Sequence, residues 1–216
     1  MIGEIDDAMR SLVREAPGIG KDIDVALEAP TKDWAARRNA PTVNLFLYDI
    51  REDTKRRSQG FLERRDEKGI VTERTPPPRY FKLSYLVTAW TQRPDDEHRL
   101  LDALMRCFLR FDAIPEAFVV DTIAETGLPA WISVALPPPE DRAFADVWSS
   151  LGGELKPSLD VVVTAPISTG VVYRVGPPVT VGLKGNFEWI GLDVSESRSW
   201  RSPKKPAEAP ARSRGR

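Results

Sequence analysis

Hydrophobic positions spaced three and four residues apart predict two amphipathic helices. The first lies near the N-terminus, ends before Pro17 and Gly18, and has an apolar face made of Ile2, Ile5, Met9, Leu12 and Val13. The second begins at Pro94 with acidic residues in its first turn, and its stripe comprises Leu100, Leu101, Leu104, Met105, Phe108 and Leu109. Weaker patterns predict shorter helices at 116–125 and 140–151.

Alternating or continuous apolar runs predict strands at 23–27, 43–50, 81–89, 131–136 and 159–165. The run at 43–50 is apolar on both faces, which is typical of a central strand. Trp34, in the loop between the first two runs, is expected to pack as a lid over the core. The order of elements predicts an α+β fold: a mixed or mainly antiparallel sheet with helices packed on one side.

The segment 55–74 differs from these runs because it is highly charged. Its turn is expected at 66–69, and with few apolar residues to bury, this hairpin is predicted to protrude. Basic residues gather there (Lys55, Arg56, Arg57, Arg64, Arg65), interleaved with acidic ones (Glu52, Asp53, Glu63, Asp66, Glu67). Alternating signs suit complementary protein contacts better than a phosphate backbone.

The C-terminal apolar runs have no helix to cover them. Strands are predicted at 171–175 and 179–183, and a third is expected at 187–192. An isolated hairpin is at best marginal in water, so these strands either fold back on their own sheet or pair with another chain. The residues predicted to bind a partner are Val171, Tyr173, Val175, Val179, Val181 and Leu183, together with Arg56, Arg57, Arg64 and Arg65.

These patterns predict three parts: an α+β domain over 1–168, a C-terminal β arm over 169–194 that contacts neighbouring subunits, and a basic tail over 195–216. The tail is rich in Pro, Ser and Arg and is expected to be disordered. Residues 198–216 hold seven basic residues and one acidic residue, a net charge of +6, whereas the whole chain carries −1. Contact of this end with nucleic acid or an anionic membrane is the less favoured alternative.

Composition narrows the class of protein. The 216 residues are 41% hydrophobic and 29% charged, which allows a real core. No apolar run approaches the roughly 20 residues that span a bilayer, and the acidic N-terminus is unlike a secretory signal. Cys107 is the only cysteine, so intramolecular disulfides are excluded and cytoplasmic synthesis is expected.

Candidate chemistry is sparse. The glycines of 18–21 lack the Ser or Thr and the spacing of a phosphate-binding loop, so a helix end explains them better. His98 is the only histidine and is expected on the surface, while Cys107 is expected to pack as a small hydrophobe. We therefore expect no catalytic residue, no cofactor, no metal and no small-molecule substrate, and we predict that the protein is not an enzyme.

Three separated motifs carry a resemblance. They are 31–37 running into 41–52 (TKDWAAR, PTVNLFLYDIRE), 80–90 with 95–101 (YFKLSYLVTAW, DDEHRLL), and 151–159 (LGGELKPSL). Together, over about residues 1–168, the chain resembles the cap or tail-terminator proteins of extracellular contractile injection systems, which are phage-tail-like particles.

The resemblance implies a structural protein that forms a ring, expected to be a hexamer, at the end of the particle distal to the baseplate. Its expected partners are its own copies, the inner tube protein and the sheath protein, whose subunits are knitted together by exchanged strands. The ring would stop both polymers from growing and would leave the cytoplasm only within a released particle. A phage tail-completion or connector subunit is the alternative of the same class, and an adaptor that acts on a membrane or nucleic acid through 198–216 is another.

Overall fold

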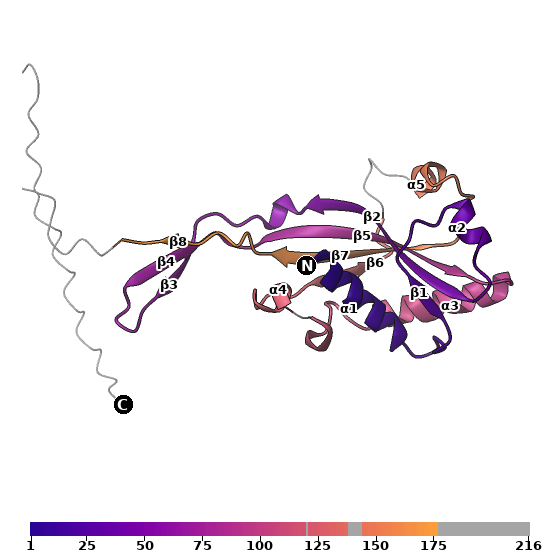
Figure 1. Ribbon diagram of the computed structural model, residues 1–216, viewed down its shortest axis with the longest axis horizontal. Helices are drawn as coiled ribbons and strands as arrows, with labels where there is room; N and C mark the ends of the chain where they lie inside the picture. Colours follow the sequence, from indigo (N-terminus) through magenta and orange to yellow (C-terminus); the bar gives the residue numbers. More distant parts are fainter. Residues whose placement is uncertain (120, 138–143, 177–216) are drawn as a thin grey trace, which may run out of the picture. The chain divides into compact units, whose positions relative to one another are not determined.

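The computed structural model describes residues 1–119, 121–137 and 144–176, and its centre is a five-stranded main sheet (Figure 1). The strand order is β1-β2-β5-β7-β6; β1 runs parallel to β2, and the other neighbours are antiparallel. The bounds are β1 (Asp24–Ala26), β2 (Thr42–Glu52), β5 (Arg79–Trp90), β6 (Trp131–Val134) and β7 (Leu159–Ile167). The strands predicted at 179–183 and 187–192 and the tail at 195–216 lie outside the described residues.

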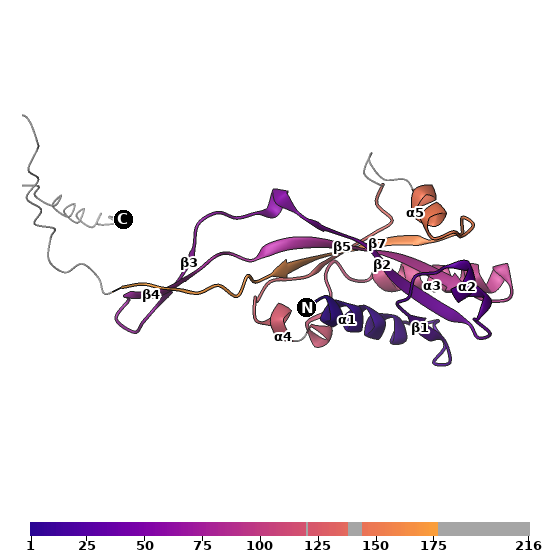
Figure 2. The same ribbon diagram turned by 45° about the horizontal axis from the view of Figure 1, so that its top comes forward.

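Helices α1 (Ile2–Arg14) and α3 (Pro94–Phe108) cover one face of the main sheet, as Figures 1 and 2 show. Their apolar stripes meet the alternate side chains of β5 that point to that face, and Leu83, Tyr85 and Val87 are completely buried there. The short helices η2 (Glu116–Phe118) and α4 (Asp121–Ala124) lie near the N-terminal end of α1, and they take the place of the one helix predicted over 116–125. The periodicity of the two long helices therefore placed the core correctly.

The opposite face of the main sheet is covered in part by two short helices, α2 (Lys32–Ala36) and α5 (Phe144–Ser150). The side chain of Thr31 caps α2 by accepting a hydrogen bond from the backbone N–H of Trp34. The predicted α+β class and mixed sheet are confirmed. The prediction of helices on one side holds for α1, α3 and α4. The helix predicted at 140–151 is observed as α5 within the described residues, but α5 and the additional helix α2 lie on the other face.

A separate three-stranded sheet, hereafter the small sheet, consists of β3 (Leu62–Arg65), β4 (Val71–Thr75) and β8 (Tyr173–Arg174). Its strand order is β3-β4-β8, with both pairs antiparallel. Since β2 ends, β5 begins and β7 ends at the same end of the main sheet, the small sheet continues from that end. Figure 1 shows the three strands side by side beyond it.

The turn between β3 and β4 forms where the sequence predicts it. The Asp66 carboxylate accepts hydrogen bonds from the backbone N–H groups of Lys68 and Ile70, both at 2.9 Å. Gly69 supplies the left-handed backbone that the turn requires, with φ of +77°. This local chemistry explains why a hairpin with so little apolar surface is still formed.

Two predictions about this region are changed by the structure. The hairpin was placed at 55–74, but Lys55 and Arg56 lie in the 3-10 helix η1 (Thr54–Arg56), before the hairpin strands begin. The cause is that this turn follows directly from the end of β2. For the strand at 171–175, two alternatives were open: pairing within the chain or pairing with another chain. One edge of this strand, β8, pairs with β4 of the same chain.

Candidate protein-interaction site

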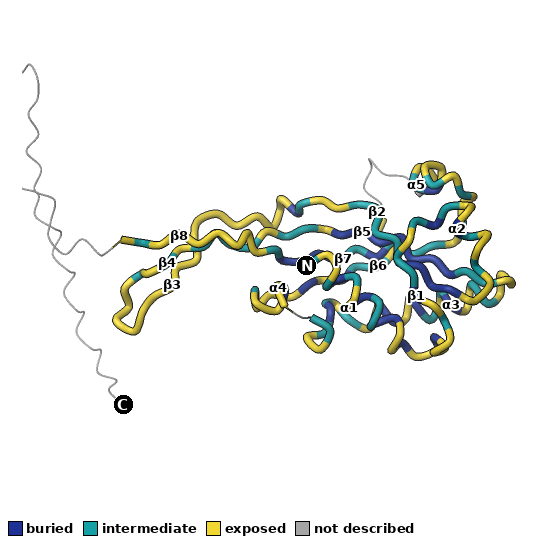
Figure 3. Tube along the Cα trace, in the orientation of Figure 1, coloured by how far each residue is buried: buried dark blue, intermediate teal, exposed yellow. Residues whose placement is uncertain are grey.

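The small sheet has little burial on either face. Every residue from 61 to 70 is exposed, and Figure 3 shows the exposed colour along β3 and β8, while β4 alternates between exposed and intermediate. Large apolar side chains are among them: Phe61 and Leu62 are each 55% exposed, and Val172 and Tyr173 are each 52% exposed. No helix that the structure describes packs on this sheet, and a sheet of this size gains little from its own contacts alone. It is therefore the strongest candidate for an interaction site in the described part of the chain.

The pairing register gives the small sheet two different faces. On one face Arg64 lies opposite Glu73, and their side chains form an ion pair at 3.4 Å, with Arg174 next to Glu73 on β8. On the other face Glu63 lies opposite Arg74 and forms an ion pair with it at 3.1 Å. The two ion pairs confirm the assignment of faces, because cross-strand neighbours point the same way.

The aromatic residues of the small sheet lie on the face of Arg74. Tyr173 is paired with Arg74 in the register, and the Tyr173 ring meets the ring of Phe61 edge-on, with centroids 5.6 Å apart and an interplanar angle of 86°. Edge-to-face rings at this distance attract each other weakly. Both rings are still more than half exposed, so most of their apolar area is available to a partner.

The four arginines predicted to bind a partner divide into two groups. Arg64 and Arg65 lie on β3, where Arg65 forms an ion pair with Glu63. Arg57 lies at the end of the main sheet and donates two hydrogen bonds to the Glu52 carboxylate, which lowers the pKa of Glu52. These three arginines are thus paired within the chain.

Arg56, the fourth, lies over the face of the main sheet opposite α1. Its guanidinium is 5.5 Å from the ring centroid of Tyr80 and 5.7 Å from that of Trp131. Asp53 is its ion-pair partner at 3.6 Å. Arg56 therefore fixes η1 against the main sheet through cation–π contacts and is not part of the small sheet.

The predicted strand residues have different outcomes. Val171 and Tyr173 are exposed beside β4, while the backbone N–H of Val175 donates to the carbonyl oxygen of Thr72 at 3.0 Å. The other three residues of the set lie outside the described residues: Val179, Val181 and Leu183.

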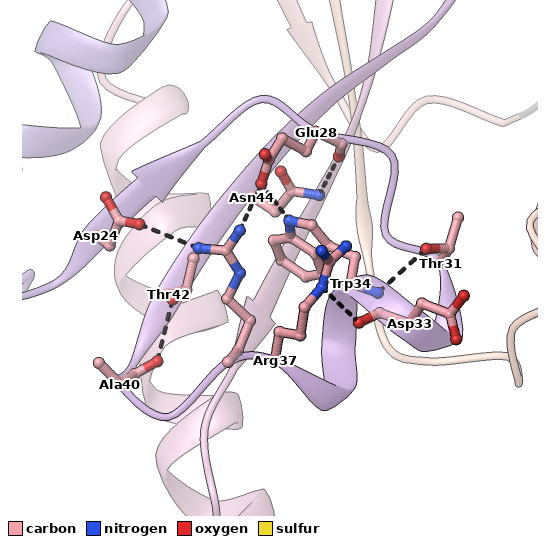
Figure 4. Close-up of polar contacts among 10 residues, drawn as sticks. Asp24, Glu28, Thr31, Asp33, Trp34, Arg37, Ala40, Thr42 and Asn44 are labelled. Atoms are coloured by element: carbon pink, nitrogen blue, oxygen red, sulfur yellow. Dashed lines mark hydrogen bonds and ion pairs between the residues drawn. The ribbon is translucent and has the colours of Figure 1, made fainter.

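At the far end of the main sheet lies a second candidate, the tryptophan cluster of Trp34, Trp90 and Trp148. Trp34 meets Trp90 edge-on at 5.2 Å, and Trp90 lies 6.5 Å from Trp148. Figure 4 shows Glu28 between the indole N–H of Trp34 and a neighbouring guanidinium, both of which donate to its carboxylate. That guanidinium belongs to Arg38 and stacks over the Trp34 ring at 4.5 Å.

The tryptophan cluster joins all three motifs that carry the sequence resemblance. Lys156, from 151–159, lies 4.4 Å from the centroid of the Trp90 ring and forms an ion pair with Glu97. A cavity of about 360 Å³ beside the cluster is lined by Thr31, Trp90 and Trp148, among others. Sequence analysis missed this convergence, because the three tryptophans come from separate segments.

The residues considered for chemistry lie in separate places. Cys107 is 3% exposed, its thiol donates to the carbonyl oxygen of Leu12 at 3.4 Å, and burial raises the pKa of this thiol. His98 is exposed, as predicted. Gly18, at φ of +89°, lies in the turn after α1, as expected for a helix end. Within 1–119, 121–137 and 144–176, no group of His, Cys, Asp and Glu is arranged to hold a metal ion, and no helix is long and apolar enough to cross a membrane.

Comparison with known proteins gives one family. A family model described as the Pvc16 N-terminal domain matches residues 4–181. Comparison with curated proteins gave no match.

Several solved structures share the fold, including the following two. The chain is similar to the sheath/tube terminator of the PVC extracellular contractile injection system in its extended state, with 23% identity and a TM-score of 0.64 over 89% of this chain and 65% of that one. It is also similar to the anti-feeding prophage cap, a tube-terminating cap, with 20% identity and a TM-score of 0.60 over 84% of this chain and 60% of that one. The chain thus spans less than two thirds of either neighbour.

Proposed function

The chain belongs to the Pvc16 N-terminal domain family, and from that premise we propose that it is a structural cap, which ends the growth of the tube and sheath of a contractile injection particle. The two similar structures carry the descriptions of a sheath/tube terminator and a tube-terminating cap. The function belongs to assembly and not to catalysis.

A cap has a specific physical task. A helical stack of subunits has heterologous contacts, so each open face recruits a further layer unless something blocks it. The blocking subunit must bind the last layer on one side and offer no equivalent surface on the other. A molecule with a self-contained body and a single uncovered extension suits this task.

The observation that carries the proposal is the small sheet. It is built from the hairpin and from β8, no helix of the described residues covers it, and Phe61 and Tyr173 are more than half exposed. The strands of this region pair with backbone of the sheath protein, so that main-chain hydrogen bonds provide affinity and alternate side chains set the register. The residues whose side chains are proposed to set this register are Val171, Tyr173, Val175, Val179, Val181 and Leu183.

The arginines set the orientation of the contact. Arg64 is 81% exposed at its side chain even though it is near Glu73, so it reaches a partner readily. Arg65 on the same strand and Arg56 and Arg57 at the end of β2 present further charges towards tube or sheath. Charge complementarity of this kind selects the partner and its orientation more than it adds affinity.

The cap acts as a ring of identical copies, for which a hexamer is the proposed number. A ring raises avidity, because after the first contact the remaining ones are effectively intramolecular. Individually weak strand contacts are then sufficient. The cap is incorporated into the particle in the producing cell and leaves it only with the particle.

The test is to replace 61–76 by a short Gly/Ser linker and to assemble particles with this variant as the only cap. We expect a folded protein with the same unfolding temperature, because the replaced residues are outside the hydrophobic core. Particles are expected to have tubes of irregular length and poorly retained sheath by electron microscopy. A matched control changes Arg99, an exposed residue of α3, to Ala. Normal particles with the linker variant would contradict the proposal.

A further inference from the structure

The two edges of the small sheet are built differently. On the β3 edge, Glu63, Arg64 and Arg65 are consecutive charged residues, and the register with β4 shifts between Arg64 and Arg65. Charges and bulges are the usual protection of an edge strand against further pairing. The β3 edge is therefore protected.

The β8 edge has less of this protection. Val171, Val172, Tyr173 and Val175 are β-branched or aromatic, which favours strand pairing. Arg174 is the single charge between them, and the register with β4 runs from Tyr173 to Arg174 without a shift. Among the residues that the structure describes, no strand pairs with the β8 edge on the side away from β4, so this edge is the better candidate for an added strand.

The hydrogen bonds of β8 show which backbone groups are available. The backbone N–H of Val175 donates to the carbonyl oxygen of Thr72 of β4 at 3.0 Å, so the backbone N–H and C=O of Val175 point towards β4. Backbone groups alternate along a strand, and those of Arg174 consequently point away from β4, in phase with those of Val172. The free edge thus presents the N–H and C=O of Arg174 at its centre.

The side chains beside this edge have a definite pattern. Arg174 lies on the face where Glu73 already pairs with Arg64, and among the described residues no carboxylate lies within ion-pair distance of Arg174. On that face one acidic side chain, Glu73, thus lies between two arginines, Arg64 and Arg174. On the other face the neighbour of an added strand is the aromatic ring of Tyr173.

We infer that the β8 edge, and not the β3 edge, receives a strand from another polypeptide in which acidic and apolar residues alternate. The acidic residue lies beside Arg174, and the β-branched or aromatic residue lies beside Tyr173, because opposite charges and apolar pairs stabilise cross-strand neighbours. This inference rests on the proposed function and specifies the partner strand of the same site.

The first test compares proline with alanine at matched positions. Arg174→Pro removes an outward N–H, whereas Arg174→Ala removes only the side chain. Glu63→Pro and Glu63→Ala form the corresponding pair on β3. By the same alternation of backbone groups along a strand, the N–H and C=O of Glu63 point away from β4. In the particle assembly assay, we expect Arg174→Pro to release sheath far more than Arg174→Ala, with no such difference at Glu63. A larger proline effect at Glu63 would assign the added strand to β3 and overturn the inference.

The unfolding temperatures of the same two Arg174 variants test the alternative that the β8 edge is paired within its own chain. If residues after 176 occupied the β8 edge of their own chain, Arg174→Pro would lower the unfolding temperature of the isolated full-length protein clearly more than Arg174→Ala. We expect the two unfolding temperatures to be the same. A difference would overturn the inference, and the cap function would stand or fall separately on the linker variant.

The second test measures the side-chain pattern directly. Two soluble fluorescent peptides, one alternating Val with Glu and one alternating Val with Lys, are titrated with the full-length protein. We expect the Glu peptide to bind about fivefold tighter, the size of one or two cross-strand charge pairs. Arg174→Glu should reverse the preference, whereas Arg99→Glu on α3 should not. Equal binding of both peptides, or a preference unaffected by Arg174→Glu, would contradict the assigned pattern.

Discussion

The tryptophan cluster and the small sheet are built from the same ingredients and end in opposite states. Both join segments that are far apart in sequence, and both combine aromatic rings with arginines and carboxylates. In the cluster Trp34 and Trp148 are 4% and 2% exposed, whereas Phe61 and Tyr173 of the small sheet are 55% and 52% exposed. The rings of the cluster are mostly buried within the chain, whereas those beside the small sheet are more than half exposed, as the proposed partner contact requires.

The difference follows from what lies behind each set of rings. Trp34 belongs to α2, Trp148 to α5 and Trp90 to β5, and the contacts between their rings bury Trp34 and Trp148 almost completely. Among the described residues, the ring contact of Phe61 and Tyr173 is with each other. Burial of a large side chain is worth a few kcal/mol, and a ring that is more than half exposed gains only part of it until a partner covers the rest. Under the proposed function, stability depends mainly on the main sheet with its helices, and binding depends mainly on the small sheet.

The largest effect is expected from Trp34→Ala. Removing a fully buried indole should lower the free energy of unfolding by about 3–5 kcal/mol. Urea denaturation of the isolated protein measures it. Trp131→Ala is the matched control, because Trp131 is 39% exposed and its truncation should cost much less. Equal costs at the two positions would remove the distinction between a closed and an open region.

A smaller loss of folding stability is expected when an extra methyl group is forced into the tryptophan cluster. A Cβ added at Gly153 would lie 3.1 Å from Cε3 of Trp148, whereas one added at Gly176 beside β8 would meet nothing within 4 Å. Gly153→Ala should destabilise the protein by about 1–3 kcal/mol, and Gly176→Ala should leave the unfolding temperature unchanged. Differential scanning calorimetry of the two variants provides the comparison. An unchanged Gly153→Ala protein would show that the cluster is loosely packed.

Tyr173→Ala should barely affect the isolated protein. Its edge-to-face contact with Phe61 is worth about 1 kcal/mol at most at this exposure. In particle assembly the same change should weaken cap retention strongly, because the ring lies beside the proposed added strand. Thermal unfolding and sheath retention are measured on the same preparation. A large loss of stability with normal retention would reverse the roles given to the two regions.

The smallest expected effect is on the pH dependence of stability, and it comes from a polar contact between α1 and β5 of the main sheet. The Tyr85 hydroxyl donates to Asp6 at 2.7 Å, and burial raises the pKa of Asp6 above its usual value of 3.8. The stability contributed by this group is complete below pH 3.8 and is lost as the pH rises through the raised pKa. Asp6→Asn should remove that part of the pH dependence of unfolding. The exposed neighbour provides the control, since Asp7→Asn should retain it.

Much of the body could be predicted from sequence, because its residues follow simple periods. The stripe of α1 and the alternation of β5 determine which side chains face the core, whatever the strand order is. The position of β7 between β5 and β6 could not be predicted, since no local pattern encodes which strands become neighbours. The tryptophan cluster was hidden for the same reason.

The candidate site was predicted in composition but not in arrangement. The charges and the turn of the hairpin are local, so its existence could be inferred. The pairing of β8 with β4 joins residues about 100 positions apart through two short strands, and nothing in either segment specifies that partner. The prediction that Arg56 belongs to the hairpin was wrong, because the 3-10 helix that follows β2 has no distinctive sequence pattern.

Hydrogen exchange of the backbone amides, compared between the isolated protein and assembled particles, tests the central claim most directly. The amides of Leu62–Arg65, Val71–Thr75 and Tyr173–Arg174 should exchange rapidly in isolation and become strongly protected in the particle, while those of β5 stay protected in both. Unchanged exchange of these three strands on assembly would contradict the claim that the small sheet is completed by a partner.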